Sequence, residues 1–185
     1  MSKKVLALVG MPGAGKSFCV EHLNEQGIPS VYFGGVVVDE AKRRYGETNE
    51  KYEKEIREEF REVDGKGAIA KRIIPKIHDL FKTHDRVVAD GLYSWTEYKM
   101  FKDEFGHDAI VVAIAAPRST RHERLASRPI RPLTESEVSS REYAEIENLE
   151  KGGPIANADY TIVNDEDPYV LIERLEHILH QTDFL

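Results

Sequence analysis

Apolar residues gather along the chain in short runs that predict buried strands. Val5 to Val9 is an unbroken apolar segment bounded by turn residues, as expected of a strand covered on both faces. Five such runs predict strands at residues 5–9, 30–33, 86–91, 109–115 and 160–163.

Between these runs, apolar residues recur at the spacing of amphipathic helices. Ile69, Ile73 and Ile77 fall on one stripe, although Pro75 in the same segment predicts a kink or a break. Helices are expected at residues 16–26, 36–44, 49–63, 68–82, 95–105, 117–127, 135–149 and 168–180. The expected N-caps are Thr48, Ser94 and Thr134.

Strands that alternate with helices predict an α/β fold of three layers, with a parallel sheet between helices. The length of 185 residues suits one domain, and we expect residues 1–185 to form it. Helical insertions fall at about residues 36–84 and 118–150, after the second and the fourth strand.

Composition limits where the protein works. It is 41% hydrophobic and 32% charged, as in soluble globular proteins, and no apolar run approaches a membrane span. The chain enters its first strand at once, so we expect no targeting segment and a cytoplasmic location. The single cysteine, Cys19, excludes an internal disulfide and is expected to be a buried packing residue.

Charge also limits the partners. The formal net charge is −7, which argues against general nucleic-acid binding, because neutralising phosphates needs a basic surface. A nucleic-acid-processing ATPase is therefore disfavoured.

One stretch carries a specific chemical signal. It fits the pattern G-x-x-x-x-G-K-[ST] and consists of Gly10, Met11, Pro12, Gly13, Ala14, Gly15, Lys16 and Ser17. Between a predicted strand and a predicted helix, such a loop directs backbone N–H groups at a phosphate chain. Lys16 is expected to reach the β- and γ-phosphates, and the Ser17 hydroxyl to hold Mg²⁺. The stretch predicts a site for a nucleoside triphosphate, with ATP and Mg²⁺ as its ligands.

A second signal is the acid that closes the third predicted strand. Asp90 follows an apolar run, at the end of a parallel strand where ligands bind in open α/β sheets. Together with the loop it predicts a metal-side carboxylate of the catalytic site. A capping role for Asp90 is the alternative.

A third signal is a run of arginines after the fourth strand. Its members are Arg118, Arg121, Arg124, Arg128 and Arg131, and the last four are spaced to lie along one helix side. Planar cations suit the charge that develops in phosphoryl transfer, which favours a phosphate role, chiefly for Arg128 and Arg131. The alternative is a salt-bridged surface helix with the partners Glu123, Glu135 and Glu137.

In their order, these motifs resemble the P-loop nucleotide kinases of the adenylate-kinase and dephospho-CoA-kinase branch. The late segment from Ala158 to Asn164 adds to the likeness, which is strongest to adenylate-kinase-related proteins that are well represented in archaea. The resemblance implies strand order 2-3-1-4-5, an acceptor-binding helical insertion after strand two and an arginine-rich lid after strand four. It also implies that Arg124 and Arg128 are lid arginines at the nucleotide.

The acceptor side departs from the family pattern. Where adenylate-kinase-like proteins carry Gly-Asp and then Arg after strand two, this chain has Gly34, Gly35 and Val38. Where the pattern Asp-Gly-x-Arg follows strand three, the arginine is replaced by Tyr93. A nucleoside monophosphate would lack its usual arginine clamps, so it is a less favoured acceptor than the resemblance implies.

Other side chains could serve the acceptor instead. Tyr93 and Trp95 could stack on a base or cover an apolar group, and packing at the helix start is the alternative. Asp39 or Glu40 could be the acceptor-side carboxylate.

These observations predict an ATP-dependent kinase that moves the γ-phosphoryl group to a small nucleotide-like acceptor. Its expected catalytic residues are Lys16, Asp90, Arg128 and Arg131. The alternatives are a nucleotide-dependent switch or slow NTPase with an altered acceptor pocket, and an activity like that of dephospho-CoA kinase. The expected partners are ATP and a small phosphate-accepting molecule, and the protein is expected to be a monomer or a homodimer.

Overall fold

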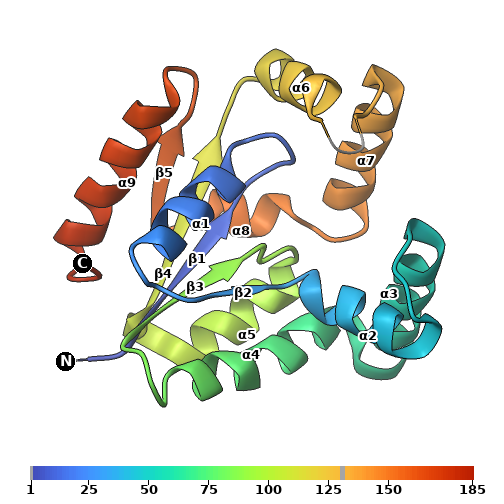
Figure 1. The fold of residues 1–185 in the computed structure, drawn as a ribbon, viewed down its shortest axis with the longest axis horizontal. Helices are drawn as coiled ribbons and strands as arrows, with labels where there is room; N and C mark the ends of the chain where they lie inside the picture. Colours follow the sequence, from blue (N-terminus) through green and yellow to red (C-terminus); the bar gives the residue numbers. More distant parts are fainter. Residues whose placement is uncertain (1, 130–131) are drawn as a thin grey trace.

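A sheet of five parallel strands runs through the middle of the computed structural model, which describes residues 2–129 and 132–185 (Figure 1). The order β2-β3-β1-β4-β5 confirms the order that the family resemblance implies. The strands are β1 (Lys4–Val9), β2 (Ser30–Tyr32), β3 (Arg86–Asp90), β4 (Ala109–Ala115) and β5 (Tyr160–Val163).

Helices cover both faces of this sheet and make the fold three-layered, as predicted. The helices α1 and α9 pack on one face, and α4 and α5 pack on the other (Figure 1). In chain order the helices are α1 (Lys16–Glu25), α2 (Gly35–Tyr45), α3 (Glu50–Asp64), α4 (Ala68–Leu80), α5 (Trp95–Phe105), α6 (Arg118–Ser127), α7 (Glu135–Glu147), α8 (Gly152–Ala156) and α9 (Pro168–Gln181). Short 3₁₀ turns, Gly65–Gly67 and Gly106–Asp108, follow α3 and α5.

The two faces of β1 supply two separate halves of the core. Val5, Ala7 and Val9 join the cluster beneath α4 and α5, whereas Leu6 and Leu8 join the cluster beneath α1 and α9. All five side chains are buried. Side chains alternate between the faces of a strand, so a central parallel strand must be apolar throughout.

One local prediction was wrong, and so was one half of another. The N-cap of α3 is Asn49 instead of Thr48, because the Asn49 side chain accepts a hydrogen bond from the Tyr52 backbone N–H at 3.0 Å. The Thr48 hydroxyl donates to Glu53 instead. Of the kink or break predicted at Pro75, the break was wrong, because α4 runs uninterrupted from Ala68 to Leu80, and the kink stays a prediction.

Other local predictions were confirmed. Ser94 and Thr134 each cap a helix and form a complete capping box with a glutamate three residues later. Cys19 is fully buried, and burial raises the pKa of its thiol to about 12, so it is an inert packing residue.

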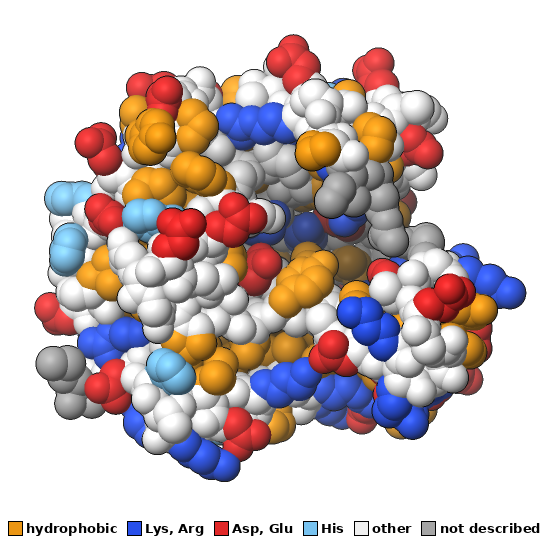
Figure 2. Space-filling view, in the orientation of Figure 1, with side chains coloured by type: hydrophobic (Ala, Val, Ile, Leu, Met, Phe, Trp, Pro, Cys, Tyr) orange, Lys and Arg blue, Asp and Glu red, His pale blue; other side chains and the backbone are white. Residues whose placement is uncertain are grey.

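Two helical segments extend beyond the carboxyl ends of the strands. The pair α2–α3 follows β2, and the pair α6–α7 follows β4 (Figure 1). Figure 2 shows that the surface is hollowed between these pairs, with basic and acidic side chains at the floor of the hollow. Among the described residues, no helix has both the length and the apolar composition that a membrane span needs.

Candidate phosphate-binding site

The turn between β1 and α1, residues 10–17, packs through its backbone against two other elements. Gly10 and Gly13 have φ angles of 147° and 78°, which favour glycine. A Cβ on Gly10 would lie 2.3 Å from the Ile114 carbonyl oxygen, and a Cβ on Gly13 would lie 2.7 Å from that of Arg121. Side chains at these two positions would push the loop off β4 and α6.

The loop presents hydrogen-bond donors that have no acceptor. Within the described part of the chain, the backbone N–H groups of Gly13, Gly15 and Lys16 donate no hydrogen bond. The Lys16 ammonium turns back onto the loop and donates to the carbonyl oxygens of Gly10 and Met11, at 2.8 and 3.3 Å. Unpaired N–H groups at a helix start, beside an ammonium group, fit a chain of phosphates.

Lys16 lies in a charged but poorly solvated place. Burial, and after it the positive charge of Lys151, lower the pKa of its ammonium group to about 8. The carboxylates of Asp90 and Glu145 act in the opposite direction. An anion bound beside Lys16 would relieve this repulsion.

Asp90 ends β3 next to the loop, because Asp90 pairs in register with Leu8 of β1. Burial raises the pKa of its carboxyl, and the ammonium groups of Lys16 and Lys151 counteract this effect. This arrangement places a carboxylate within the field of two cations, at the edge where the parallel strands end.

The described residues offer few ligands to a metal ion. They contain no group of three or more His, Cys, Asp or Glu side chains that could hold one. Ser17 is exposed in the first turn of α1, and Asp90 is half-buried at the strand edge. A hydroxyl and a carboxylate fit Mg²⁺ when phosphate oxygens and waters complete its six ligands.

Two arginines of the run after β4, one of them the predicted lid residue Arg124, bind the back of the loop. Arg124 donates to the Gly13 carbonyl at 3.3 Å and to the Asn164 carbonyl at 3.4 Å. The buried Arg121 donates to the Pro12 carbonyl at 3.4 Å. The helix α6 therefore holds the loop through its carbonyl groups, and the contact of Arg124 with nucleotide phosphates stays a prediction.

Glu142 of α7 pairs with the same helix. Its buried carboxylate accepts hydrogen bonds from Arg121 and, at 3.2 Å, from Arg118, and it lies 3.4 Å from the His122 ring. The salt-bridged alternative thus applies to Arg118 and Arg121, but through a partner other than the three expected. The remaining predicted residues are Arg128, half-buried directly after α6, and Arg131, which lies outside the described residues.

The acceptor-side carboxylates are engaged in ion pairs away from Lys16. Asp39 lies 3.2 Å from the Lys76 ammonium. The Glu40 carboxylate accepts hydrogen bonds from Arg43 and Arg44, each at 2.6 Å. Nothing in this arrangement directs either carboxylate at the loop.

The two aromatic residues after β3 have packing partners. The Trp95 ring stacks on Tyr98, with centroids 5.1 Å apart, and a Cβ on Gly153 would lie 2.8 Å from it. The Tyr93 ring meets Phe33 edge to face at 6.4 Å. For Trp95 the packing alternative describes the structure.

Sequence reasoning missed Lys151 and Glu145. Lys151 is only 2% exposed, and its Nζ lies 2.5 Å from the Glu145 carboxylate and 5.0 Å from the Tyr93 ring centroid. The segment Lys151-Gly152-Gly153-Pro154 indicated only the end of a helix. Lys151 follows Glu145 by six residues in a segment rich in charged residues, and nothing in that spacing predicts that the lysine is buried.

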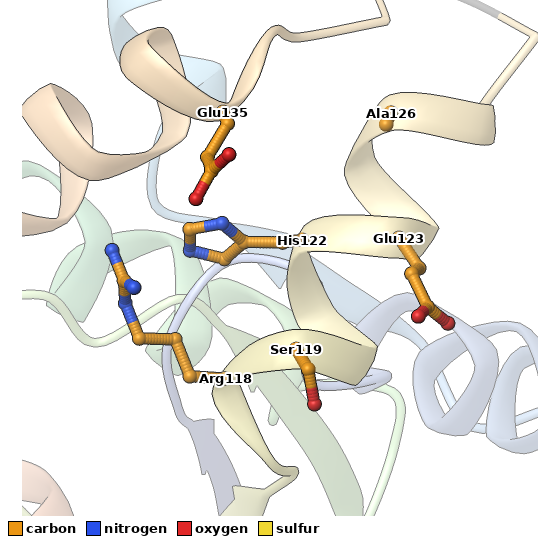
Figure 3. Close-up of a pocket in the computed structure, with 6 residues that line it drawn as sticks. All are labelled: Arg118, Ser119, His122, Glu123, Ala126 and Glu135. Carbon is orange, nitrogen blue, oxygen red and sulfur yellow. The ribbon is translucent and has the colours of Figure 1, made fainter.

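Two hollows lie outside the loop. One, of about 390 Å³, lies on the outer side of α6, where the His122 ring points between the Arg118 and Glu135 side chains (Figure 3). The other, of about 500 Å³, lies beside the edge strand β2 and includes Tyr32, Gly35 and Asp39. Neither is lined by a residue of the loop.

Solved structures of other proteins share this fold. TT1252 from Thermus thermophilus matches with a TM-score of 0.66 and 18% identity, over 98% of each chain. Shikimate kinase from Bacteroides thetaiotaomicron matches with a TM-score of 0.64 and 16% identity, over 96% of this chain and 98% of that one. A gluconokinase from Sinorhizobium meliloti matches with a TM-score of 0.56 and 16% identity, over 96% and 97%. At these identities the likeness shows a P-loop kinase-like fold alone.

Sequence comparison identifies closer relatives. A family model described as an AAA domain matches residues 6–148. A UPF0200 protein of Thermococcus sibiricus is 36% identical over 164 residues, which cover 87% of this chain and 86% of the relative. A UPF0200/UPF0201 protein of Archaeoglobus fulgidus is 36% identical over 183 residues, and the match spans 97% of this chain but only 56% of that longer relative. The chain belongs to the UPF0200 family of P-loop proteins.

Proposed function

We propose that the protein is an ATP-dependent phosphotransferase that moves the γ-phosphoryl group to a small nucleotide-like acceptor. The observation that carries this proposal is the loop itself. Among the residues that the structure describes, the N–H groups of Gly13, Gly15 and Lys16 have no acceptor, and the Lys16 ammonium group beside them donates to loop carbonyls. A triphosphate would satisfy these donors and the charge of Lys16 together.

The proposed roles follow from placement. The loop and Lys16 would bind the β- and γ-phosphates, and Ser17 and Asp90 would hold Mg²⁺. The ion supplies positive charge that offsets the charge building up on the phosphate oxygens. In the transfer, the bond from the γ-phosphorus to its bridging oxygen breaks and a bond to the acceptor oxygen forms. ADP leaves, and the proton of the acceptor hydroxyl passes to solvent.

The two projecting helical segments would frame this reaction. We assign the segment at about residues 36–84 to the acceptor and the segment at about 118–150 to a lid, within one domain of residues 1–185. The hollow between them in Figure 2 supports this assignment. Arg124, Arg128 and Arg131 would act from the lid, which would exclude water from the transfer site.

The contacts of the residues expected to serve the acceptor favour a second candidate function. Asp39 pairs with Lys76, Glu40 pairs with Arg44, and the Trp95 ring stacks on Tyr98. These three of the side chains expected to serve the acceptor therefore have partners within the protein. A slow NTPase or nucleotide-dependent switch needs no acceptor, and such a protein fits this arrangement too.

An acceptor panel separates the two candidates. The protein is given Mg·ATP with nucleoside monophosphates, deoxynucleotides, nucleosides, dephospho-CoA, shikimate or gluconate, and ADP release is measured. Shikimate and gluconate enter because two structural neighbours are named as their kinases. A kinase releases ADP at least tenfold faster with its acceptor than without. If every acceptor leaves the rate at background, the switch or NTPase is favoured.

A loop variant tests the site itself. Lys16→Ala removes the ammonium group at the phosphates and is expected to lower ADP release at least a hundredfold, because the charge stabilises the transition state. Lys82→Ala, which removes an exposed lysine paired with Asp79, is the matched control and should retain full activity. Retained activity in Lys16→Ala, with an unchanged circular dichroism spectrum in both variants, would contradict the assignment.

A further inference from the structure

Asn164 is a buried amide that reaches the back of the loop at residues 10–17 from the end of β5. It is 5% exposed, and its Nδ2 group donates a hydrogen bond to the Ala14 carbonyl at 2.8 Å. Its backbone N–H donates to the Ala115 carbonyl at 2.7 Å, at the end of β4. Asn164 is therefore fixed by the sheet, and in turn it fixes one carbonyl of the loop.

The fit between Asn164 and the loop depends on Gly15. A Cβ on Gly15 would collide with Asn164 Nδ2, and Gly15 has a φ angle of 112°, which favours glycine. The amide thus occupies the space that a side chain at position 15 would fill. Only the NH₂ end of an amide can donate to a carbonyl, so the contact with Ala14 determines which way the Asn164 side chain faces.

The carbonyl that Asn164 holds belongs to the same peptide group as the Gly15 N–H. In a planar trans peptide the C=O and the N–H point in opposite directions. Because Asn164 binds the Ala14 carbonyl, the Gly15 N–H faces away from Asn164. This N–H is one of the three loop donors without an acceptor in the described chain, so Asn164 sets the direction of a donor that a ligand can use.

The other polar atom of the Asn164 side chain gains nothing from its position. Its Oδ1 atom is buried and has no hydrogen-bond partner within residues 2–129 and 132–185. A buried amide oxygen without a partner destabilises a fold, so an apolar side chain would suit a position that only fills space. Exceptions of this kind are typical of functional sites. The presence of an amide here is explained by its bond to the loop.

We propose that Asn164 is a positioning residue of the nucleotide site, which holds the Ala14 carbonyl from behind the loop and so aims the Gly15 N–H at a bound phosphate. This rests on the proposed function, because it requires a phosphate chain in the loop. The donor is oriented before a nucleotide arrives, so binding does not have to order it.

The test observes this one peptide group directly. The sequence contains a single Ala-Gly pair, Ala14-Gly15, so protein labelled with ¹³C at alanine carbonyls and ¹⁵N at glycine gives one carbonyl-to-amide NMR signal. The ligand is the Mg complex of the non-hydrolysable imido analogue of ATP, and calorimetry measures its affinity. In the wild type the Gly15 amide proton should shift downfield on binding, because its N–H then donates to an anionic oxygen.

Variants of Asn164 remove the bond behind the loop. In Asn164→Ala the analogue should bind about tenfold more weakly, the loss of one hydrogen bond, and the downfield shift of the Gly15 signal should become smaller. Asn164→Ser, whose side chain ends short of the Ala14 carbonyl, leaves a smaller void and should show the same losses. Asn24→Ala, on an exposed residue of α1, is the matched control and should keep the wild-type affinity and shift.

The possible outcomes separate the two proposals. Wild-type binding without a shift of the Gly15 signal would overturn the role of Asn164 and leave the loop assignment intact. So would full affinity in both Asn164 variants, even with a lower melting temperature, because that is the result expected of a purely structural hydrogen bond. A wild type that does not bind the analogue would overturn the proposed function and this inference with it.

Discussion

Glu97 is a residue whose position predicts a measurable pH dependence. Its carboxylate is 3% exposed and accepts hydrogen bonds from the backbone N–H groups of Tyr93 and Ser94, both at 3.0 Å. Burial raises its pKa from 4.5 to about 7, and the two N–H groups offset only part of this rise. Glu97, which completes the capping box of α5, is thus also a buried acid next to the candidate site.

The folded protein therefore keeps a proton on Glu97 that the unfolded chain releases. The stability that this proton contributes is present below pH 4.5 and is lost as the pH rises through 7. Glu97→Gln keeps an oxygen that accepts both bonds but cannot ionise. We expect the wild type to lose melting temperature, relative to Glu97→Gln, as the pH rises from 5 to 8. Glu62→Gln, on an exposed residue, should show no such trend, and the same flat profile in Glu97→Gln would contradict the raised pKa.

At the scale of elements, α6 and α7 hold together through one buried carboxylate. Glu142 is 4% exposed and Arg121 is 8% exposed, and Arg121 also contacts the loop through Pro12. Removing one member of a buried pair leaves the other charge without its counter-ion. Glu142→Ala is expected to lower the free energy of unfolding by about 3 kcal/mol, measured by urea titration. Glu123→Ala, on the exposed side of α6, should lower the free energy of unfolding by less than about 0.5 kcal/mol. An equal loss in Glu142→Ala and Glu123→Ala would show that the Arg121–Glu142 pair does not stabilise the fold.

Most helices and strands could be predicted from the sequence, because buried positions recur with the period of the element. The short helix α8 was missed, since Gly152, Gly153 and Pro154 indicated a break. The apolar runs of β1 and β4 must be continuous in a sheet covered on both faces, and such runs are legible without a structure. The cap of α3 could not be resolved, since Thr48 and Asn49 both suit the position and only the backbone decides. Pro75 did not break α4 because Ile73 and Ile77 on either side are fully buried, and their packing outweighs one lost hydrogen bond.

The candidate site was predictable where a residue belongs to a local pattern, as in the loop and at Asp90, which ends an apolar strand. The loop at 10–17 is one local pattern, and backbone geometry alone makes it a phosphate cradle. Glu142 acts on the loop through Arg121, which donates to the Pro12 carbonyl more than a hundred residues away. No spacing in the sequence encodes that approach. The arginine stripe was visible, but whether it faces phosphate or Glu142 depends on how α6 and α7 pack.

For the whole molecule, the strand order explains why a ligand in the loop should stabilise everything around it. The strand β1 is central, and the side chains on its two faces pack into the two halves of the core. The loop that follows it contacts β4 through Gly10, α6 through Gly13 and the end of β5 through Gly15. A ligand bound there would be tied to both halves of the core and to α6 at once.

This connection predicts a large thermal shift with the correct nucleotide. At a free concentration one hundred times its dissociation constant, Mg·ATP should stabilise the fold by about 2.7 kcal/mol. For a chain of 185 residues this raises the melting temperature by roughly 5 to 10 °C, which differential scanning fluorimetry measures. AMP at the same concentration lacks the β- and γ-phosphates and should shift it by less than about 1 °C. In Lys16→Ala, ATP should raise the melting temperature much less than in the wild type. The backbone N–H groups of the loop remain, but the ammonium group that attracts the triphosphate is gone. An ATP shift that is equal in Lys16→Ala and in the wild type would mean that ATP binds elsewhere than in the loop.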